Sequence, residues 1–200
     1  MRTVLCWLSL LLAWPAGAEE LPIDRSRARD LEPYKPQIRR YSLRHYGEDT
    51  WRLEPTCIVL HYTAGANFPW NLVNSTSFAG EPPGLAVHYV VDGRKIWETL
   101  PTTVRSRGAY GINHRALNIE MVARDAGDLA GRPETLETSR QLCRYLMDRF
   151  GIPKNKIYSH QQVARMDPSV VPEVLDLVNG APYDKIDPGE ANMAAIKKGL

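Results

Sequence analysis

The sequence contains no block of like charges. Its 25 Lys and Arg residues nearly balance 23 Asp and Glu residues, and the formal net charge at pH 7 is +2. Neither a basic stretch nor an acidic tail stands out, although such patches are the electrostatic mark of proteins that bind nucleic acids. We therefore expect no nucleic-acid partner, and chemistry on a small molecule or a polymer stays open.

Long apolar runs are also absent after the first eighteen residues. At the N-terminus, Arg2 precedes an apolar run from Val4 to Trp14, and Pro15 interrupts it before Ala16-Gly17-Ala18. This pattern is typical of a secretory signal peptide, and the run is shorter than the roughly 20 helical residues that span a bilayer. We expect residues 1–18 to be removed, leaving a periplasmic or secreted monomer without a membrane span.

Cysteine is scarce, with three residues in the whole chain. Cys6 lies within the expected signal peptide, so the mature protein keeps Cys57 and Cys143. An even pair in an oxidising compartment permits one disulfide without requiring it. A disulfide and two buried thiols therefore both remain possible, and neither cysteine lies where a nucleophile would be expected.

The full chain of 200 residues, 44% of them hydrophobic, has the length and composition of one globular domain. Residues 19–56 contain four prolines and little apolar periodicity, which predicts an extended arm with room for one short helix. Residues 57–200 carry the domain. The loop 67–84 that follows the first strand holds Trp70 and Phe78, which either line a cleft or pack beneath the loop.

Two short strands are each expected to end on a histidine. Ile58-Val59-Leu60 is a branched apolar run that leads into His61, and Lys156-Ile157-Tyr158-Ser159 leads into His160. Ligands of open sheets usually bind at the carboxyl ends of strands. A lone histidine in such a place is more often structural, but two together suggest a shared site.

A hairpin is predicted over residues 86–100, because Asp92-Gly93 is typical of a type I′ turn. His88 lies in its first strand, either beside the site or simply packed. Residues 136–150 have a helical apolar period that ends at Gly151, so this helix should cover the sheet.

A carboxylate, Glu120, interrupts the apolar strand of residues 117–122. Apolar surroundings raise the pKa of a carboxyl group and suit it to act as a general base. The alternative is a glutamate that faces solvent on an edge strand.

The segment of residues 183–189 contains Lys185 and Asp187. Two imidazoles and one carboxylate, with a fourth position left to water, form a catalytic rather than a structural zinc site. We expect Zn²⁺ to be held by His61, His160 and Asp187, with Lys185 on the same side. A surface turn with ordinary charges is the alternative.

Five segments together resemble the type-2 N-acetylmuramoyl-L-alanine amidases, a family that includes phage lysozymes and peptidoglycan recognition proteins. They are IVLHYTAG (58–65), AVHYVVDGRKIWETLP (86–101), LNIEMV (117–122), YSHQQVA (158–164) and KIDPG (185–189). The resemblance implies an α/β fold with a central mixed sheet flanked by helices, one zinc ion, and a peptidoglycan or muropeptide substrate. The bond cleaved would join the lactyl group of N-acetylmuramic acid to L-alanine.

The resemblance also implies roles for single residues. His61, His160 and Asp187 match the zinc ligands, Glu120 the general base, and Lys185 the group that stabilises the oxyanion. Asp187 follows His160 at a longer interval than usual, because residues 170–182 have the pattern of an inserted apolar helix. Asp167 is therefore a rival third ligand.

A second departure is Arg105-Ser106-Arg107-Gly108, which stands where the family has a substrate-contacting histidine. Substrate preference is therefore open. Two other functions remain as alternatives: a non-catalytic peptidoglycan-binding module on the same fold, and a zinc peptidase that cuts within the stem peptide.

Overall fold

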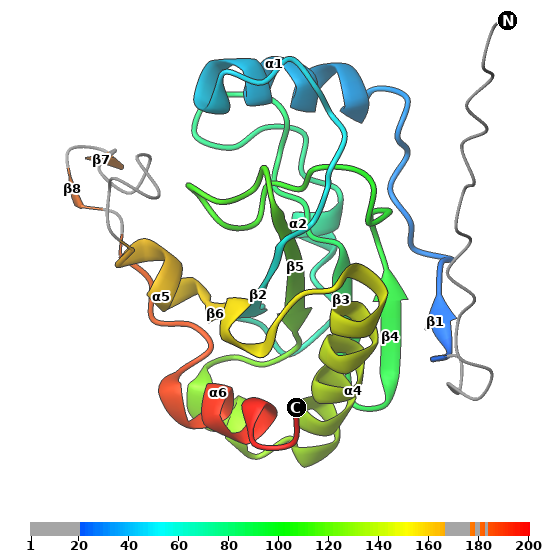
Figure 1. The fold of residues 1–200 in the computed structure, drawn as a ribbon, viewed down its shortest axis with the longest axis vertical. Coiled ribbons are helices and arrows are strands. Elements are labelled where there is room, and N and C mark those ends of the chain that lie inside the picture. The colour runs from blue at the N-terminus through cyan, green and yellow to red at the C-terminus, as the bar shows by residue number, and fades with distance from the viewer. Residues whose placement is uncertain (1–20, 167–176, 179–180, 183) are drawn as a thin grey trace, which may run out of the picture.

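A six-stranded mixed sheet forms the centre of the protein in the computed structural model, which describes residues 21–166, 177–178, 181–182 and 184–200 (Figure 1). The strands lie in the order β1-β4-β3-β5-β2-β6, and neighbours are parallel except β3 and β4. Their bounds are Ile23–Asp24 (β1), Cys57–Tyr62 (β2), Tyr89–Asp92 (β3), Lys95–Glu98 (β4), Ala116–Met121 (β5) and Ile157–Ser159 (β6). The expected α/β fold with a central mixed sheet is confirmed.

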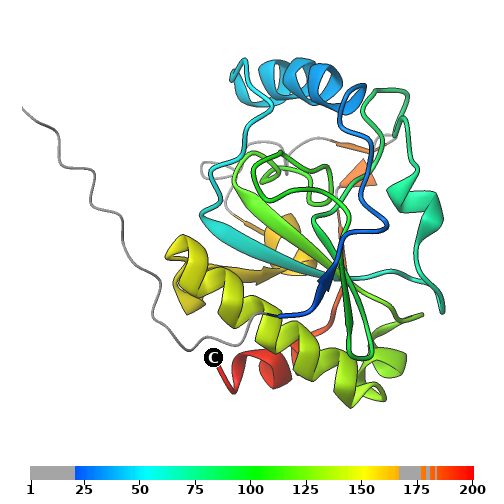
Figure 2. The ribbon, with the colours of Figure 1, turned by 90° about the vertical axis from the view of Figure 1, so that its right-hand side faces the viewer.

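Helices cover this sheet. They are α1 (Tyr34–Tyr46), α2 (Trp70–Val73), α3 (Ala126–Ala130), α4 (Pro133–Phe150), α5 (His160–Ala164) and α6 (Glu190–Lys197), with a 3₁₀ turn at Lys154–Lys156. The predicted long helix is confirmed as α4, which ends at a left-handed Gly151. Figure 2 shows α4 and α6 on one side of the sheet and α1 on the other. No helix in the described ranges is long and apolar enough to cross a membrane.

The two central strands divide their side chains between the two faces of the sheet, because successive residues of a strand point in opposite directions. Ile58 and Leu60 of β2 join the core beneath α4. On the opposite face lie His61 of β2 and, from the neighbouring β5, Asn118 and Glu120, all buried. The polar residues of both strands are thus gathered on the face away from α4.

The two cysteines lie on opposite faces. Cys57 packs with Val59 and Ala116 on the polar face, whereas Cys143 of α4 belongs to the core on the other side. Both are buried free thiols, so the alternative of two thiols is confirmed and the disulfide is wrong.

The predicted hairpin is confirmed, but the predicted type I′ turn is wrong. Asp92 pairs with Lys95, so the central turn residues are Gly93 and Arg94. Of the four, only Gly93 has a positive φ, 57°, whereas a type I′ turn needs positive φ at both central positions.

The N-terminal arm is more ordered than its prolines indicate. β1 adds a parallel edge strand to β4, and α1 spans 13 residues. Tyr34, Ile38 and Tyr41 recur at helical spacing and are buried against Leu100 and other apolar residues. The helical period was hidden because two of these three core positions are tyrosines set among charged residues.

Three sequence predictions involve residues outside the described ranges. These are the signal peptide at 1–18, the rival ligand Asp167, and most of the helix predicted for 170–182. Within that last range, the described part is a two-stranded ladder of β7 (Leu177–Val178) and β8 (Ala181–Pro182), so the helix prediction is wrong there.

Candidate active site

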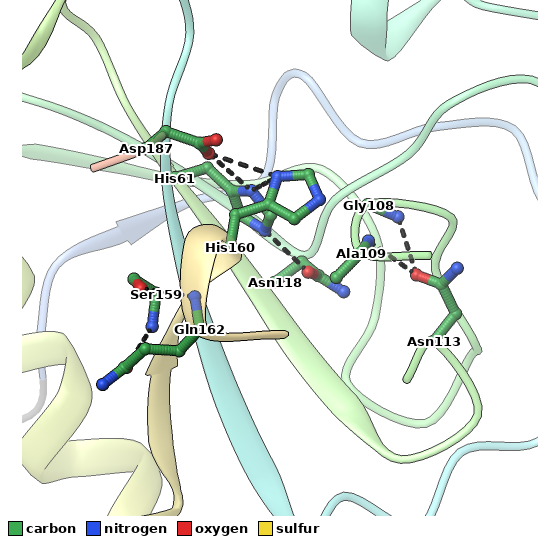
Figure 3. Close-up of polar contacts among 9 residues, drawn as sticks. All are labelled: His61, Gly108, Ala109, Asn113, Asn118, Ser159, His160, Gln162 and Asp187. Atoms are coloured by element: carbon green, nitrogen blue, oxygen red, sulfur yellow. Dashed lines mark hydrogen bonds and ion pairs between the residues drawn. The ribbon is translucent and has the colours of Figure 1, made fainter. Parts of the chain in front are cut away.

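Three potential metal-binding side chains meet on the polar face of the sheet (Figure 3). The Nδ1 atoms of His61 and His160 are 3.0 Å apart, and Oδ2 of Asp187 lies 3.2 Å from each of them. All three residues are at least nine-tenths buried. Residues far apart in the sequence therefore place one nitrogen or oxygen each around a single point.

Local structure fixes each of the three. His61 is the second-to-last residue of β2, next to Tyr62, which ends the strand. His160 is the first residue of α5 rather than the last of a strand, because Ser159 and Gln162 form a capping box that starts the helix. The carbonyl oxygen of Asp187 accepts a hydrogen bond from the backbone N–H of Gln161 in that same helix, at 3.1 Å.

The spacing of these three atoms suits a zinc ion. Ligand atoms at about 2.0–2.2 Å from a tetrahedral ion lie roughly 3.3–3.6 Å from one another. The observed separations of 3.0 and 3.2 Å are close to that value. Two imidazoles and one carboxylate also leave a coordination position for water, as in catalytic zinc sites.

The electrostatics of the three side chains also favour a bound metal ion. Burial opposes ionisation of Asp187, but hydrogen bonds to both imidazoles outweigh it and lower the pKa of its carboxyl group. Burial likewise opposes charge on His61, yet Asp187 and Glu120 raise its pKa. Burial and the neighbouring His61 lower the pKa of His160 to about 4. The carboxylate therefore attracts positive charge to a place where a metal ion would displace a proton.

Glu120 lies beside this cluster on the polar face. It is the partner of His61 in the pairing of β5 with β2, and its Oε2 has no hydrogen-bond partner among the described residues. Burial raises the pKa of Glu120 to about 7, with Asp187 adding to the rise and His61 and Lys185 opposing it. The alternative of a solvent-facing glutamate on an edge strand is wrong, because β5 is central and Glu120 is 7% exposed.

Lys185 lies near the same group. It is half-buried, and its charge lowers the pKa values of both Glu120 and His160. The structure thus brings together all five residues singled out in the sequence.

His88 is packed away from the three donors. It is fully buried, its Nε2 lies 2.9 Å from the carbonyl oxygen of Val104, and its Nδ1 accepts the backbone N–H of Asn118 at 3.0 Å. Both ring nitrogens are thereby used in holding the chain together.

Trp70 and Phe78 of the neighbouring loop are about half exposed, at 50% and 48%.

Asn118 was missed by the sequence analysis. Its Oδ1 lies 2.8 Å from Nε2 of His61, the ring nitrogen that faces away from the other two donors. The signal was present, since Asn118 is two residues before Glu120 and therefore on the same face of a buried strand.

A donor set of this kind beside a carboxylate could hold a metal ion, and metal-dependent hydrolases use such sets. The profile of the N-acetylmuramoyl-L-alanine amidase family matches residues 51–189, and the chain belongs to this family. No curated protein sequence gives a significant match.

Two solved structures, with TM-scores just above 0.5, agree on the fold. A mutant endolysin from Bacillus subtilis has a TM-score of 0.51 and 15% identity over 72% of this chain and 87% of its own. The catalytic domain of XlyA has a TM-score of 0.51 and 16% identity over the same shares. The N-acetylmuramoyl-L-alanine amidase LysC from Clostridium intestinale is 23% identical over 57% of this chain and 75% of its own, with a TM-score of 0.49.

Proposed function

We propose that the protein is a zinc-dependent N-acetylmuramoyl-L-alanine amidase that cleaves the amide between the lactyl group of N-acetylmuramic acid and L-alanine. The observation that carries this proposal is the buried carboxyl group of Glu120, beside three converging metal donors. Its pKa is about 7, and one of its oxygens has no hydrogen-bond partner among the residues that the structure describes. A binding module has no need of such a carboxyl group. A hydrolase needs a base that is poised near neutral pH.

His61, His160 and Asp187 would hold the zinc ion. When bound there, zinc lowers the pKa of a coordinated water toward 7 and polarises a substrate carbonyl. Asp187 is kept ionised by both imidazoles, so it supplies the negative charge that a dication requires at this buried place.

Glu120 would move the proton. With a pKa of about 7, it is partly ionised at neutral pH and accepts a proton from the attacking water. It then returns this proton to the nitrogen of the departing L-alanine, which leaves as an amine. Burial aids the first step, since a carboxylate with an ordinary pKa near 4 would be a weaker base.

Lys185 would stabilise the oxyanion that develops on the lactyl carbonyl during attack. Its charge acts on both Glu120 and His160, which supports this role. The N-terminal pattern of residues 1–18 supports export, so the enzyme would meet peptidoglycan in the periplasm or outside the cell.

Mass spectrometry of muropeptides after incubation with purified, zinc-loaded protein tests the proposal. The expected products are free stem peptide beginning with L-alanine and sugar that carries an unsubstituted lactyl group. Shortened stems still attached to sugar would show a peptidase instead, and binding without any product would show a recognition module. The Glu120→Gln variant is the matched control, since its carboxamide keeps the shape but cannot accept the proton.

A further inference from the structure

The ring nitrogen of His61 that faces away from the metal donors is held by a buried amide. Oδ1 of Asn118 lies 2.8 Å from Nε2 of His61, and Nδ2 of Asn118 donates to Oγ of Ser106 at 2.7 Å. Asn118 and Ser106 are 0% exposed and His61 is 1% exposed. No solvent therefore reaches this chain of contacts to replace a missing partner.

A neutral imidazole has one proton, and its position decides which nitrogen can bind a metal. With the amide oxygen toward His61, the proton belongs on Nε2, and the lone pair of Nδ1 points to His160 and Asp187. The reversed amide would direct an N–H group at Nε2. That arrangement favours the proton on Nδ1, where it blocks the metal.

The backbone leaves room for this amide at Gly108. A Cβ atom at position 108 would lie 2.8 Å from Cγ of Asn118, which is closer than packed carbon atoms come. Asn113 fixes the glycine in place, because its Oδ1 accepts the backbone N–H groups of Gly108 and Ala109 at 2.9 and 2.8 Å. The absence of a side chain at Gly108 thus leaves space for Asn118 next to His61.

The residues on either side of Ser106 anchor the same segment. Arg105 donates to the carbonyl oxygen of Arg52 at 2.8 Å and forms an ion pair with Glu48. Arg107 donates to the carbonyl oxygen of Glu81 at 2.8 Å. Both arginines are about 95% buried, so their hydrogen bonds anchor the chain on either side of Ser106.

We propose that Asn118 and Ser106 are positioning residues for the metal site: Asn118 keeps the His61 proton on Nε2, and Ser106 keeps the Asn118 amide in the orientation that does so. This inference rests on the proposed metal site. It goes beyond it by assigning the Arg105–Gly108 segment a role in metal affinity, where the family has a substrate-contacting histidine that this chain lacks.

Metal affinity, measured by competition with a chromophoric chelator, tests the inference on the full mature chain. Asn118→Leu keeps the volume but removes the acceptor, and should weaken zinc binding by about 10- to 100-fold, the usual cost of losing such a partner. Asn118→Asp keeps an acceptor and should bind within a few-fold of wild type. Ser106→Ala should show a smaller loss than Asn118→Leu.

Ser139→Ala is the matched control. Ser139 is also 0% exposed, and its Oγ has no hydrogen-bond partner within the described part of the chain, so its loss should leave zinc affinity unchanged. Wild-type zinc affinity in a folded Asn118→Leu or Ser106→Ala variant would overturn the inference.

A second measurement needs no variant. Nitrogen-15 NMR of the zinc-loaded wild type should show the His61 proton on Nε2, and a proton on Nδ1 would refute the assignment. Hydrolysis of muropeptides is scored separately. A protein that binds zinc with the His61 proton on Nε2 but releases no stem peptide contradicts the proposed function and leaves the inference standing. A wild type that takes up no zinc contradicts both.

Discussion

Replacing His88 should remove one contribution to the acid sensitivity of the fold. Burial lowers the pKa of His88 from 6.5 to about 4, and its hydrogen bond to Val104 only partly opposes this shift. Between these two pH values the unfolded chain takes up a proton that the folded chain refuses. The free energy of unfolding therefore falls as the pH drops from about 6.5 to 4, and this contribution is complete above pH 6.5.

The size of the effect follows from the shift. A change of one pKa unit corresponds to about 1.36 kcal/mol, so the difference between 6.5 and about 4 amounts to about 3 kcal/mol. His88→Gln keeps a donor and an acceptor but cannot take up a proton. Urea unfolding of wild type and variant at pH 7.5 and 4.5 should show that the variant loses less stability on acidification, by about 2–3 kcal/mol.

A destabilised variant that keeps the histidine separates this effect from general weakening. Leu142→Ala removes a fully buried side chain from the core beneath α4, at a cost of about 2–5 kcal/mol. It should retain the wild-type dependence on pH. If His88→Gln shows the same loss on acidification as wild type, His88 is not the neutral structural histidine inferred from its contacts.

Three further predictions concern the site. Glu120→Gln should keep its zinc but lose on the order of 10² to 10⁴ in the rate of stem-peptide release, and a metal-loaded variant with near-normal turnover would exclude Glu120 as the base. Lys185→Ala should lower kcat by about 10² to 10³ and leave binding to sacculi unchanged. The reason is that charge that develops only in the transition state contributes nothing to ground-state binding. A variant that binds less but turns over normally would refute the oxyanion role. Asp187→Ala should abolish zinc uptake measured by elemental analysis, whereas Asp184→Ala, which alters an exposed carboxylate nearby, should not. Equal zinc content in these last two variants would remove Asp187 from the ligand set.

Local patterns were sufficient to predict the central strands and to single out five polar residues that the structure brings together. β2 and β5 are buried on both faces, so they read as short, branched apolar runs whose few polar positions stand out. His61 and Glu120 are such positions. Their meeting across the sheet needs only the parallel pairing of two adjacent strands.

The elements that the sequence did not predict are stabilised by contacts between segments far apart in the chain. α1 is stabilised by burying Tyr34 and Tyr41 against residues some sixty positions away, and no local pattern reports that contact. The pairing of β1 with β4 is equally non-local. Asn118 was overlooked for another reason: an amide has a function there only once Ser106 and His61 are known to flank it.

The burial of Arg105 and Arg107 sets a practical limit on where the protein can be shortened. The family match begins at Trp51, and a chain trimmed to that point would lose Glu48, the ionic partner of Arg105, and Tyr41, which packs against the guanidinium of Arg107. Two buried cations would then stand beside an exposed apolar surface. Chimeric enzymes that borrow this amidase should therefore be joined ahead of Ile23, where β1 enters the sheet.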